Sequence, residues 1–317
     1  MSIVLVIIAV VVGGGMTMFS ASLQKRQFQE TQFKLKAIQK ALLDYRMANN
    51  RIPCPADVTL ALTDTNFGVE ASTAGDCYST GTVKANYRNL VAPTGTTHTT
   101  TTVDTMSSTT GISAGMAISG SGIPVGDTVA SVTNGTTIVL TTAATASAAG
   151  VTLTFVDNVQ GMVPTVTLRL PDDYAIDGWG RRIMYAVDAR FTATSALTST
   201  VIPATDAGYR MTVNDESGNA KTYAAAYVLV SFGPNGHGAF PRNGAALNAR
   251  ISSASANTDE QKNCDCSSAT PPVAASTNGI FGVFVQKQPT LNTANVLDSF
   301  DDIVAFGSRS DLRSPTE

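Results

Sequence analysis

The chain opens on a long apolar run, MSIVLVIIAVVVGGGMTMF, which only Ser2 and Thr17 interrupt. From Ser20 to Asn49 the sequence holds no proline or glycine, and apolar side chains recur at the spacing of one helix face: Leu35, Ile38, Leu42 and Tyr45. We therefore predict one helix from near residue 2 to near residue 49, about 70 Å long. The segment NNRIPCP would end it, because its prolines cannot continue a helix.

The opening run is too long for the core of a typical signal peptide. No basic residue precedes it and no small-residue cleavage site follows it. A bilayer crossing needs about 20 apolar residues, which the run nearly supplies. The pattern therefore predicts a retained membrane-spanning helix, at the least a single-pass anchor with a helical stalk. Its three glycines, Gly13, Gly14 and Gly15, mark either a place where the helix stretches or a place of close helix packing.

The middle of the chain differs in composition from the segments on either side. Within Thr94–Thr154, 19 of 61 residues are threonine, and no lysine or arginine occurs between Asn89 and Leu168. Short runs of β-branched residues alternate there with turn signals such as Asn-Gly and Gly-Ser-Gly. We predict an inserted Thr-rich β module, with a long threonine-rich loop as the alternative.

The C-terminal part reads as strands, in the segments TVTLRLP (165–171), RRIMYAVDARF (181–191), YRMTVND (209–215), AYVLVSFG (226–233) and IFGVFVQKQ (280–288). Strands after one long helix predict an α+β fold, in which the membrane-spanning helix packs on an antiparallel sheet. We divide the chain into the helix (1–52), a helix-to-sheet loop region (53–93), the Thr-rich module (94–156) and a β head (157–317). Residues 243–279 are expected to form a loop.

Composition excludes some functions. A net charge of −3 gives no field that would favour nucleic acid, and 14% charged residues is low for a soluble domain. His237 could act as a base, but no nucleophile motif accompanies it, and a turn histidine is the simpler reading. His98 is expected to be exposed. The sequence therefore indicates no enzyme and no cofactor.

The four cysteines are candidates for disulfides. Cys54 and Cys77 are expected to pair if the head is outside the cytoplasm, with a stabilisation of about 3 kcal/mol. A bond between Cys264 and Cys266 would be strained, so pairing with the first two stays open, as does a zinc site.

Two groups of carboxylates are the candidate metal ligands. They are Asp172 with Asp173, and Asp298 with Asp301 and Asp302. Calcium prefers such oxygen ligands, but no ligand motif is evident, and solvated loop acids are the alternative.

Several segments together resemble the type IV pilin and pseudopilin family. They are the opening MSIVLVIIAVVVGG, the helix exit RIPCPAD, DGWGRRIMY (177–185), VLVSFGPNGHGA (228–239) and FDDIV (300–304). In that family a Phe, a few apolar residues and a Glu come directly before such an opening. A start upstream of Met1, or a relative that is not processed, would explain their absence here. The module is similar to SGxGIPxGTxV β modules of surface and phage-tail proteins.

The resemblance implies a structural subunit, rather a minor than a major one, of a type IV pilus (a fimbrium) or of a pseudopilus for protein secretion. The assembly helix would carry Ile3, Val4, Leu5, Ile7, Ile8 and the three glycines. Its partners would be other pilins and an inner-membrane assembly platform, with the head in the periplasm and then in the filament or on the cell surface. Some pseudopilins also hold calcium near their C-terminus. The alternative is a membrane-anchored adhesin that does not polymerise.

Overall fold

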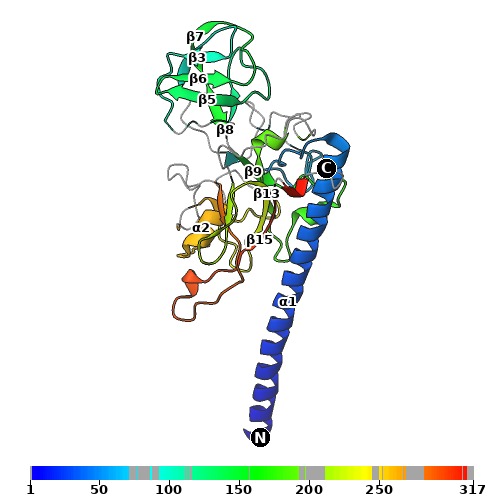
Figure 1. The fold of residues 1–317 in the computed structure, drawn as a ribbon. Helices are drawn as coiled ribbons and strands as arrows, with labels where there is room; N and C mark the ends of the chain where they lie inside the picture. The colour runs from blue at the N-terminus through cyan, green and yellow to red at the C-terminus, as the bar shows by residue number, and fades with distance from the viewer. Residues whose placement is uncertain are drawn as a thin grey trace.

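The computed structural model places a long helix beside a β-rich head, with the Thr-rich module at the end remote from the N-terminus (Figure 1). We define the head as residues 50–87 and 158–312. The structure describes residues 2–70, 77, 86–87, 93–110, 112, 114, 116–156, 158–192, 197, 211–244, 250–251, 253–266, 268, 282–308 and 310–312. Of residues 2–21, 86–87, 156, 158, 189–190 and 296 it describes the backbone.

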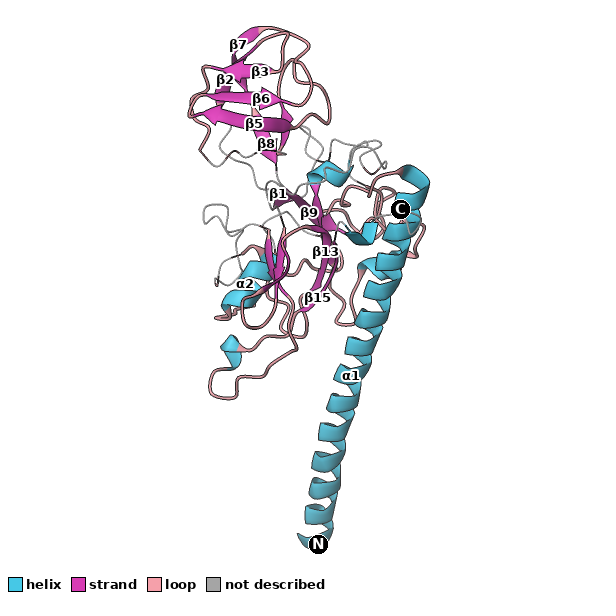
Figure 2. Cartoon of the chain, in the orientation of Figure 1, coloured by secondary structure: helices cyan, strands magenta, loops and turns pink. Residues whose placement is uncertain are grey.

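The long helix α1 comprises Ser2–Asn49, which is 48 residues and so about 72 Å. It ends where Asn50 takes a left-handed conformation, φ 53°, and donates its N–H to the carbonyl of Arg46 at 2.8 Å. Asparagine is one of the residues that tolerate this helix-ending geometry. Only the C-terminal half of α1 lies against the head, and the N-terminal half projects beyond it (Figure 2).

The packed half of α1 is held by apolar and polar contacts. Leu35, Ile38 and Leu42 are buried in the main core of the head. The Lys34 ammonium donates to the carbonyl of Ile176 at 2.9 Å and lies 2.8 Å from carboxylate oxygens of both Glu30 and Asp173. These contacts explain how an amphipathic face becomes the seam between helix and sheet.

The central sheet of the head is antiparallel, in the order β1-β9-β10-β13-β15. Asn86 pairs with Gln160 and Tyr87 with Val159, so β1 and β9 lie side by side although the whole module separates them in sequence. All residues of β10 and β13 are buried, as expected for central strands with layers on both faces. The strands are β1 (Asn86–Tyr87), β9 (Asn158–Met162), β10 (Met184–Asp188), β13 (Ala225–Ser231) and β15 (Ile303–Ser308).

A smaller sheet, β12-β11-β14, lies beside helix α2 on the head. Its strands β11 and β14 pair in parallel, and β11 pairs with β12 through the turn at Asp215–Asn219. The elements are β11 (Thr212–Asn214), β12 (Ala220–Thr222), β14 (Val283–Val285) and α2 (Thr258–Cys264). Short 3₁₀ turns complete the head: η1 (Asp172–Ala175), η2 (Ala189–Thr192), η3 (Val296–Asp298) and η4 (Ser310–Leu312).

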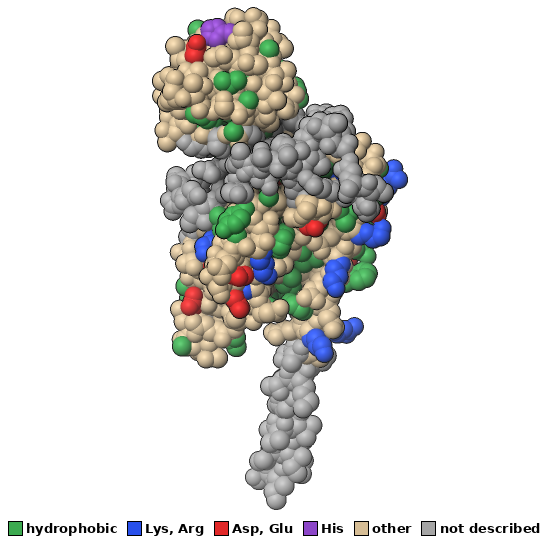
Figure 3. All heavy atoms as spheres, in the orientation of Figure 1, with side chains coloured by type: hydrophobic (Ala, Val, Ile, Leu, Met, Phe, Trp, Pro, Cys, Tyr) green, Lys and Arg blue, Asp and Glu red, His purple; other side chains and the backbone are tan. Residues whose placement is uncertain are grey.

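The Thr-rich module has its own sheets and its own core. Strands β2–β8 pair among themselves, as β5-β6-β3-β2-β7 and β4-β8, around Ile118, Ile138, Leu153 and Phe155. On the face drawn in Figure 3, lysine and arginine side chains lie on α1 and the head. The strands are β2 (Thr94–Thr97), β3 (Thr102–Asp104), β4 (Ala117–Ser119), β5 (Val129–Asn134), β6 (Thr137–Leu140), β7 (Ala148–Thr152) and β8 (Thr154–Val156).

The predicted fold class is wrong. The described structure is mostly β, with four sheets and two α-helices, because the β-branched runs of head and module form separate sheets. No helix in the described part of the chain is long and apolar enough to cross a bilayer, so the predicted membrane-spanning helix and single-pass inner-membrane location are also wrong. The prediction rested on the apolar opening run, whereas in the same helix Lys25, Arg26 and Glu30 follow within about three turns after Phe19.

Two local predictions are also corrected. Residues 165–171 do not form a strand: Leu168 and Leu170 donate their N–H groups to the carbonyls of Pro164 and Thr165, which makes successive turns. The expected loop over 243–279 contains α2. Helix α2 begins because the Asn257 side chain accepts from the N–H groups of Asp259 and Glu260.

Candidate functional site: a buried acidic cluster

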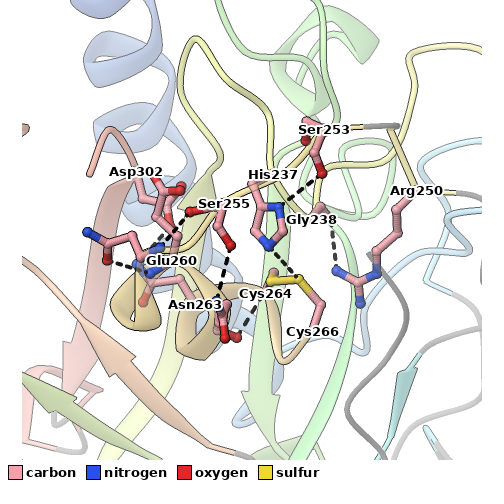
Figure 4. The surroundings of a disulfide bond; sticks show 12 residues. His237, Gly238, Arg250, Ser253, Ser255, Glu260, Asn263, Cys264, Cys266 and Asp302 are labelled. Atoms are coloured by element: carbon pink, nitrogen blue, oxygen red, sulfur yellow. Dashed lines mark hydrogen bonds between the residues drawn. A yellow bond between two sulfur atoms is a disulfide. The ribbon is translucent and has the colours of Figure 1, made fainter. Parts of the chain in front are cut away.

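Three carboxylates of the head converge where α2 meets the segment that leads into β15. Oxygens of Glu260, Asp301 and Asp302 all lie within 4.8 Å of one another. Glu260 is on the first turn of α2, and Asp301 and Asp302 directly precede β15. Figure 4 shows Glu260 and Asp302 side by side at this junction. We call these three residues the acidic cluster.

Asparagine side chains and main-chain N–H groups hold part of the cluster. Glu260 Oε1 accepts from the Asp301 N–H at 2.9 Å, and both of its oxygens accept from Asn235 Nδ2. Asp301 Oδ2 accepts from the Asn235 N–H at 3.0 Å. Asp302 Oδ2 accepts from Asn263 Nδ2 at 2.9 Å. These bonds fix the three carboxylates at close range.

Two carboxylate oxygens are left over. Asp301 Oδ1 and Asp302 Oδ1 are buried and have no hydrogen-bond partner in the described structure. Asp302 is 1% exposed. A buried carboxylate oxygen without a partner is unfavourable unless a proton or a cation compensates it.

The electrostatics of the cluster favour that compensation. Burial raises the pKa of Asp302 well above its usual range, and the charges of Glu260 and Asp301 raise it further. Burial, with the charge of Glu260 added, raises the pKa of Asp301 to about 7. Lys287 acts in the opposite direction on Asp302, but its ammonium lies 2.6 Å from Asp259. The cluster therefore either shares protons or takes up a cation.

The donor set suits a hard divalent cation. Calcium binds six to eight oxygen ligands, including carboxylates. The acidic cluster offers three carboxylates with two oxygens unused, so main-chain carbonyls or water would have to complete the shell. Calcium binding at this place stays a prediction.

Only part of the predicted ligand set comes together. Asp301 and Asp302 belong to the cluster, whereas the exposed Asp298 carboxylate accepts from Asn292 at 3.1 Å and lies apart. Glu260 was missed because 41 residues separate it from Asp301. The sequence signal for it is Asn257 followed by two acidic residues, which is typical of a helix N-terminus.

The other candidate residues have structural partners. Asp173, on η1, forms the ion pair with Lys34, and Asp172 is the first residue of the same turn. His98 Nε2 lies 3.1 Å from Asp104 on the Thr-rich module, and both side chains are 41% exposed, so the histidine expected to be exposed is half-buried.

All four cysteines form disulfides. The predicted Cys54–Cys77 bond is confirmed, with a Cα–Cα distance of 5.4 Å. Cys264 and Cys266 bond to each other, which settles the connectivity that the sequence had left open. The backbone of Asp265, which lies between them, is in the left-handed conformation at φ 46°, and the chain turns there.

Gly238, also in the left-handed region at φ 85°, leaves the space for the second disulfide. A Cβ at Gly238 would lie 2.2 Å from the Cβ of Cys264, so only glycine fits there.

The predicted assembly residues lie in the projecting half of α1. The backbone of Ile3, Val4, Leu5, Ile7 and Ile8 is helical, and the helix continues through Gly13, Gly14 and Gly15. Their side chains lie outside the described structure. The backbone thus shows no break in α1 at the glycines.

Comparison with known proteins gives no relative: no family model, no curated protein and no solved structure matches the chain.

Proposed function

We propose that the protein is a structural subunit of the pilin or pseudopilin kind, which assembles with copies of itself or with similar subunits through the N-terminal half of α1. The observation that carries the proposal is the projection of this half of the helix beyond the head (Figure 2). The head meets α1 at Gln27, whose carbonyl lies against Gly178, and residues 22–26 are exposed. About 25 residues, or roughly 38 Å of helix, therefore extend past the head.

The sequence of that segment explains why it needs a partner. No charged residue occurs before Lys25, and residues 3–12 are all apolar. A helix that is apolar on every side is buried in its working state. Each aliphatic side chain gains about 1.5–3 kcal/mol on full burial, so helices of neighbouring subunits would stabilise the segment strongly. Parallel packing of such helices produces a filament core with the heads outside.

A second role, binding at a surface, is favoured by the place of the Thr-rich module. The module lies at the opposite end of the molecule from the N-terminus of α1 (Figure 1). In an assembly held together by α1, the module would therefore be the outermost part of each subunit.

Assembly can be tested with the full chain and two matched variants. Purified protein is released from detergent, and its mass is followed by light scattering and its shape by negative-stain electron microscopy. The wild type should form filaments or large oligomers. Ile7→Asp with Val11→Asp places two carboxylates on one face of the projecting helix and should leave the protein monomeric. Gln24→Asp adds charge at an exposed position and should assemble like the wild type.

The melting temperature of the head shows whether a loss of assembly comes from unfolding. It should be the same in all three proteins, because the substitutions lie outside the packed half of α1. A monomeric wild type, or a double variant that assembles normally, would overturn the proposal.

A further inference from the structure

Next to the acidic cluster, one histidine faces the second disulfide. His237 lies on the loop that follows β13, and Cys264 and Cys266 stand at the C-terminal end of α2. His237 Nε2 is 3.5 Å from Cys266 Sγ, and the imidazole nitrogen and both sulfurs lie within 4.8 Å of one another. His237 and Cys264 are 0% exposed and Cys266 is 3% exposed. Figure 4 shows the imidazole between Ser253 and the sulfurs.

The tautomer of His237 follows from its other contact. Nδ1 is 3.2 Å from the main-chain carbonyl of Ser253, and a carbonyl only accepts. Nδ1 therefore carries the proton and donates it, which turns the lone pair of Nε2 toward the sulfurs. The N–H of His237 also donates to Asn235 Oδ1 at 2.7 Å, which fixes the loop. A carbonyl that holds one ring nitrogen while the other faces the ligand side is how proteins orient metal-binding histidines.

A buried cation contacts Gly238, the glycine that packs against the second disulfide. Arg250 is 5% exposed, and its Nη1 donates to the carbonyl of Gly238, the glycine packed against Cys264, at 2.7 Å. Arg250 Nε and Nη2 have no hydrogen-bond partner within the described part of the chain. Burial lowers the pKa of Arg250 to about 10, so the guanidinium remains charged at neutral pH. A nearby cation favours thiolate over thiol.

We propose that Cys264, Cys266 and His237 bind a thiophilic d¹⁰ cation, Zn²⁺ or Cu⁺, once the disulfide is reduced. A dithiol reductant supplies two electrons and two protons: the S–S bond breaks, each sulfur becomes a thiol, and the reductant becomes a disulfide. The metal then binds both sulfurs and Nε2, and the two thiol protons pass to solvent. Two sulfurs and one imidazole are soft donors that select Zn²⁺ and Cu⁺ over hard cations.

The two metals leave different charges in the site. With Zn²⁺ the two thiolates give a neutral centre, and a Cys₂His set leaves a fourth position for water. With Cu⁺ the centre carries one negative charge, which the guanidinium of Arg250 would balance. The site is separate from the acidic cluster, whose oxygen donors suit hard cations, and it does not depend on assembly through α1.

The test uses the full chain, reduced by a phosphine without oxygen and then desalted after addition of Zn²⁺ or, separately, Cu⁺. Reduced wild type should retain one equivalent of at least one of these metals, and protein with intact disulfides should retain none. The matched control is Cys264→Ser with Cys266→Ser, in which Cys54 and Cys77 are still reduced, and it should retain none. His237→Gln removes a ligand and should weaken binding by more than about 10–100-fold, which is the cost of losing a residue that only supports a ligand.

X-ray absorption on the metal-loaded wild type needs no variant. For Zn²⁺ it should show two sulfurs near about 2.3 Å and at least one nitrogen near about 2.0–2.1 Å. If the reduced protein retains only one of the two metals, that metal is the ion that the site binds. Equal retention by the Cys264→Ser, Cys266→Ser protein, or a spectrum without sulfur ligands, would overturn the proposal.

Discussion

Replacing Asp301 by asparagine should stabilise the head at high pH and leave it unchanged at low pH. In the folded protein the pKa of Asp301 is raised from 3.8 to about 7. Well below pH 3.8 the Asp301 carboxyl is protonated in both the folded and the unfolded chain, so it does not lower the free energy of unfolding there. Between pH 4 and 7 the unfolded chain ionises first, and the free energy of unfolding falls as the pH rises.

The size of the effect follows from the pKa. A rise in the pKa from 3.8 to about 7 lowers the free energy of unfolding by roughly 4 kcal/mol above pH 7. Asp301 keeps some contact with solvent, so Asp301→Asn should regain about 2–4 kcal/mol at pH 8. The asparagine Oδ1 can still accept from the Asn235 N–H. Removing the Asp301 charge also takes away one of the charges that raise the pKa of Asp302, and this change acts in the same stabilising direction.

Urea unfolding followed through the single tryptophan, Trp179, measures this difference at pH 4 and pH 8 in the presence of a chelator. Asp298→Asn is the matched control, because Asp298 lies on the same segment outside the cluster and is exposed. It should change the free energy of unfolding by less than about 0.5 kcal/mol at either pH. An Asp301→Asn protein that is no more stable than the wild type at pH 8, or equally stabilised at both pH values, would refute the reasoning.

Calcium should narrow the difference in stability between the wild type and Asp301→Asn. If the acidic cluster binds Ca²⁺, the wild type gains about 2.7 kcal/mol at a calcium concentration of 100 Kd, whereas Asp301→Asn gains less. The Asp298→Asn protein should respond like the wild type. No response of the wild type at millimolar Ca²⁺ would reject the cation site and leave the pH dependence to shared protons alone.

Three further predictions concern stability elsewhere. Replacing Cys54 and Cys77 by serine should lower the free energy of unfolding by about 3 kcal/mol, measured in denaturant, because a 23-residue cross-link is lost; an unchanged midpoint would contradict this. Glu70→Ala should cost about 3 kcal/mol in the same assay, because it leaves the guanidinium of Arg51, now 2.7 Å from the carboxylate, unpaired; a loss below about 1 kcal/mol would argue against a buried pair. A chain without residues 94–155 should keep the cooperative melting of the head in calorimetry, and loss of that transition would show that the module supports the head.

The sequence predicted the elements that depend on residues close together in the chain. The C-terminal bound of α1 follows from the prolines after Asn49, and its continuity between Ser20 and Asn49 follows from the absence of glycine and proline there. Strand β13 follows from an unbroken run of apolar and β-branched residues. The segment 165–171 alternates apolar and polar residues as a strand would, but it does not form one, because Val166 donates its N–H to the carbonyl of Gly68 and the chain turns at Arg169, φ 57°. That choice depends on a partner almost 100 residues away.

The candidate site was also predictable only in part, because it joins residues that are far apart in the chain. Asp301 and Asp302 are adjacent acids whose pairing is visible in the sequence, and they do lie together. Glu260 joins them only because the Asn257 side chain starts α2 and also donates to the carbonyl of Asp298 at 2.9 Å, which ties the two segments together. The disulfide between Cys264 and Cys266 likewise needs the space at Gly238, which only the folded chain provides.

Because β1 pairs with β9, the position of the Thr-rich module is one where another domain can be inserted. The chain leaves the head at Tyr87 and returns at Val159, and these two residues are neighbours across the sheet. Backbone partners in such a ladder are about 5 Å apart, so the head already holds the two ends together. Another compact domain whose own ends nearly meet could replace the module at little cost in loop-closure entropy. The head would then serve as a scaffold on which the inserted domain can be exchanged.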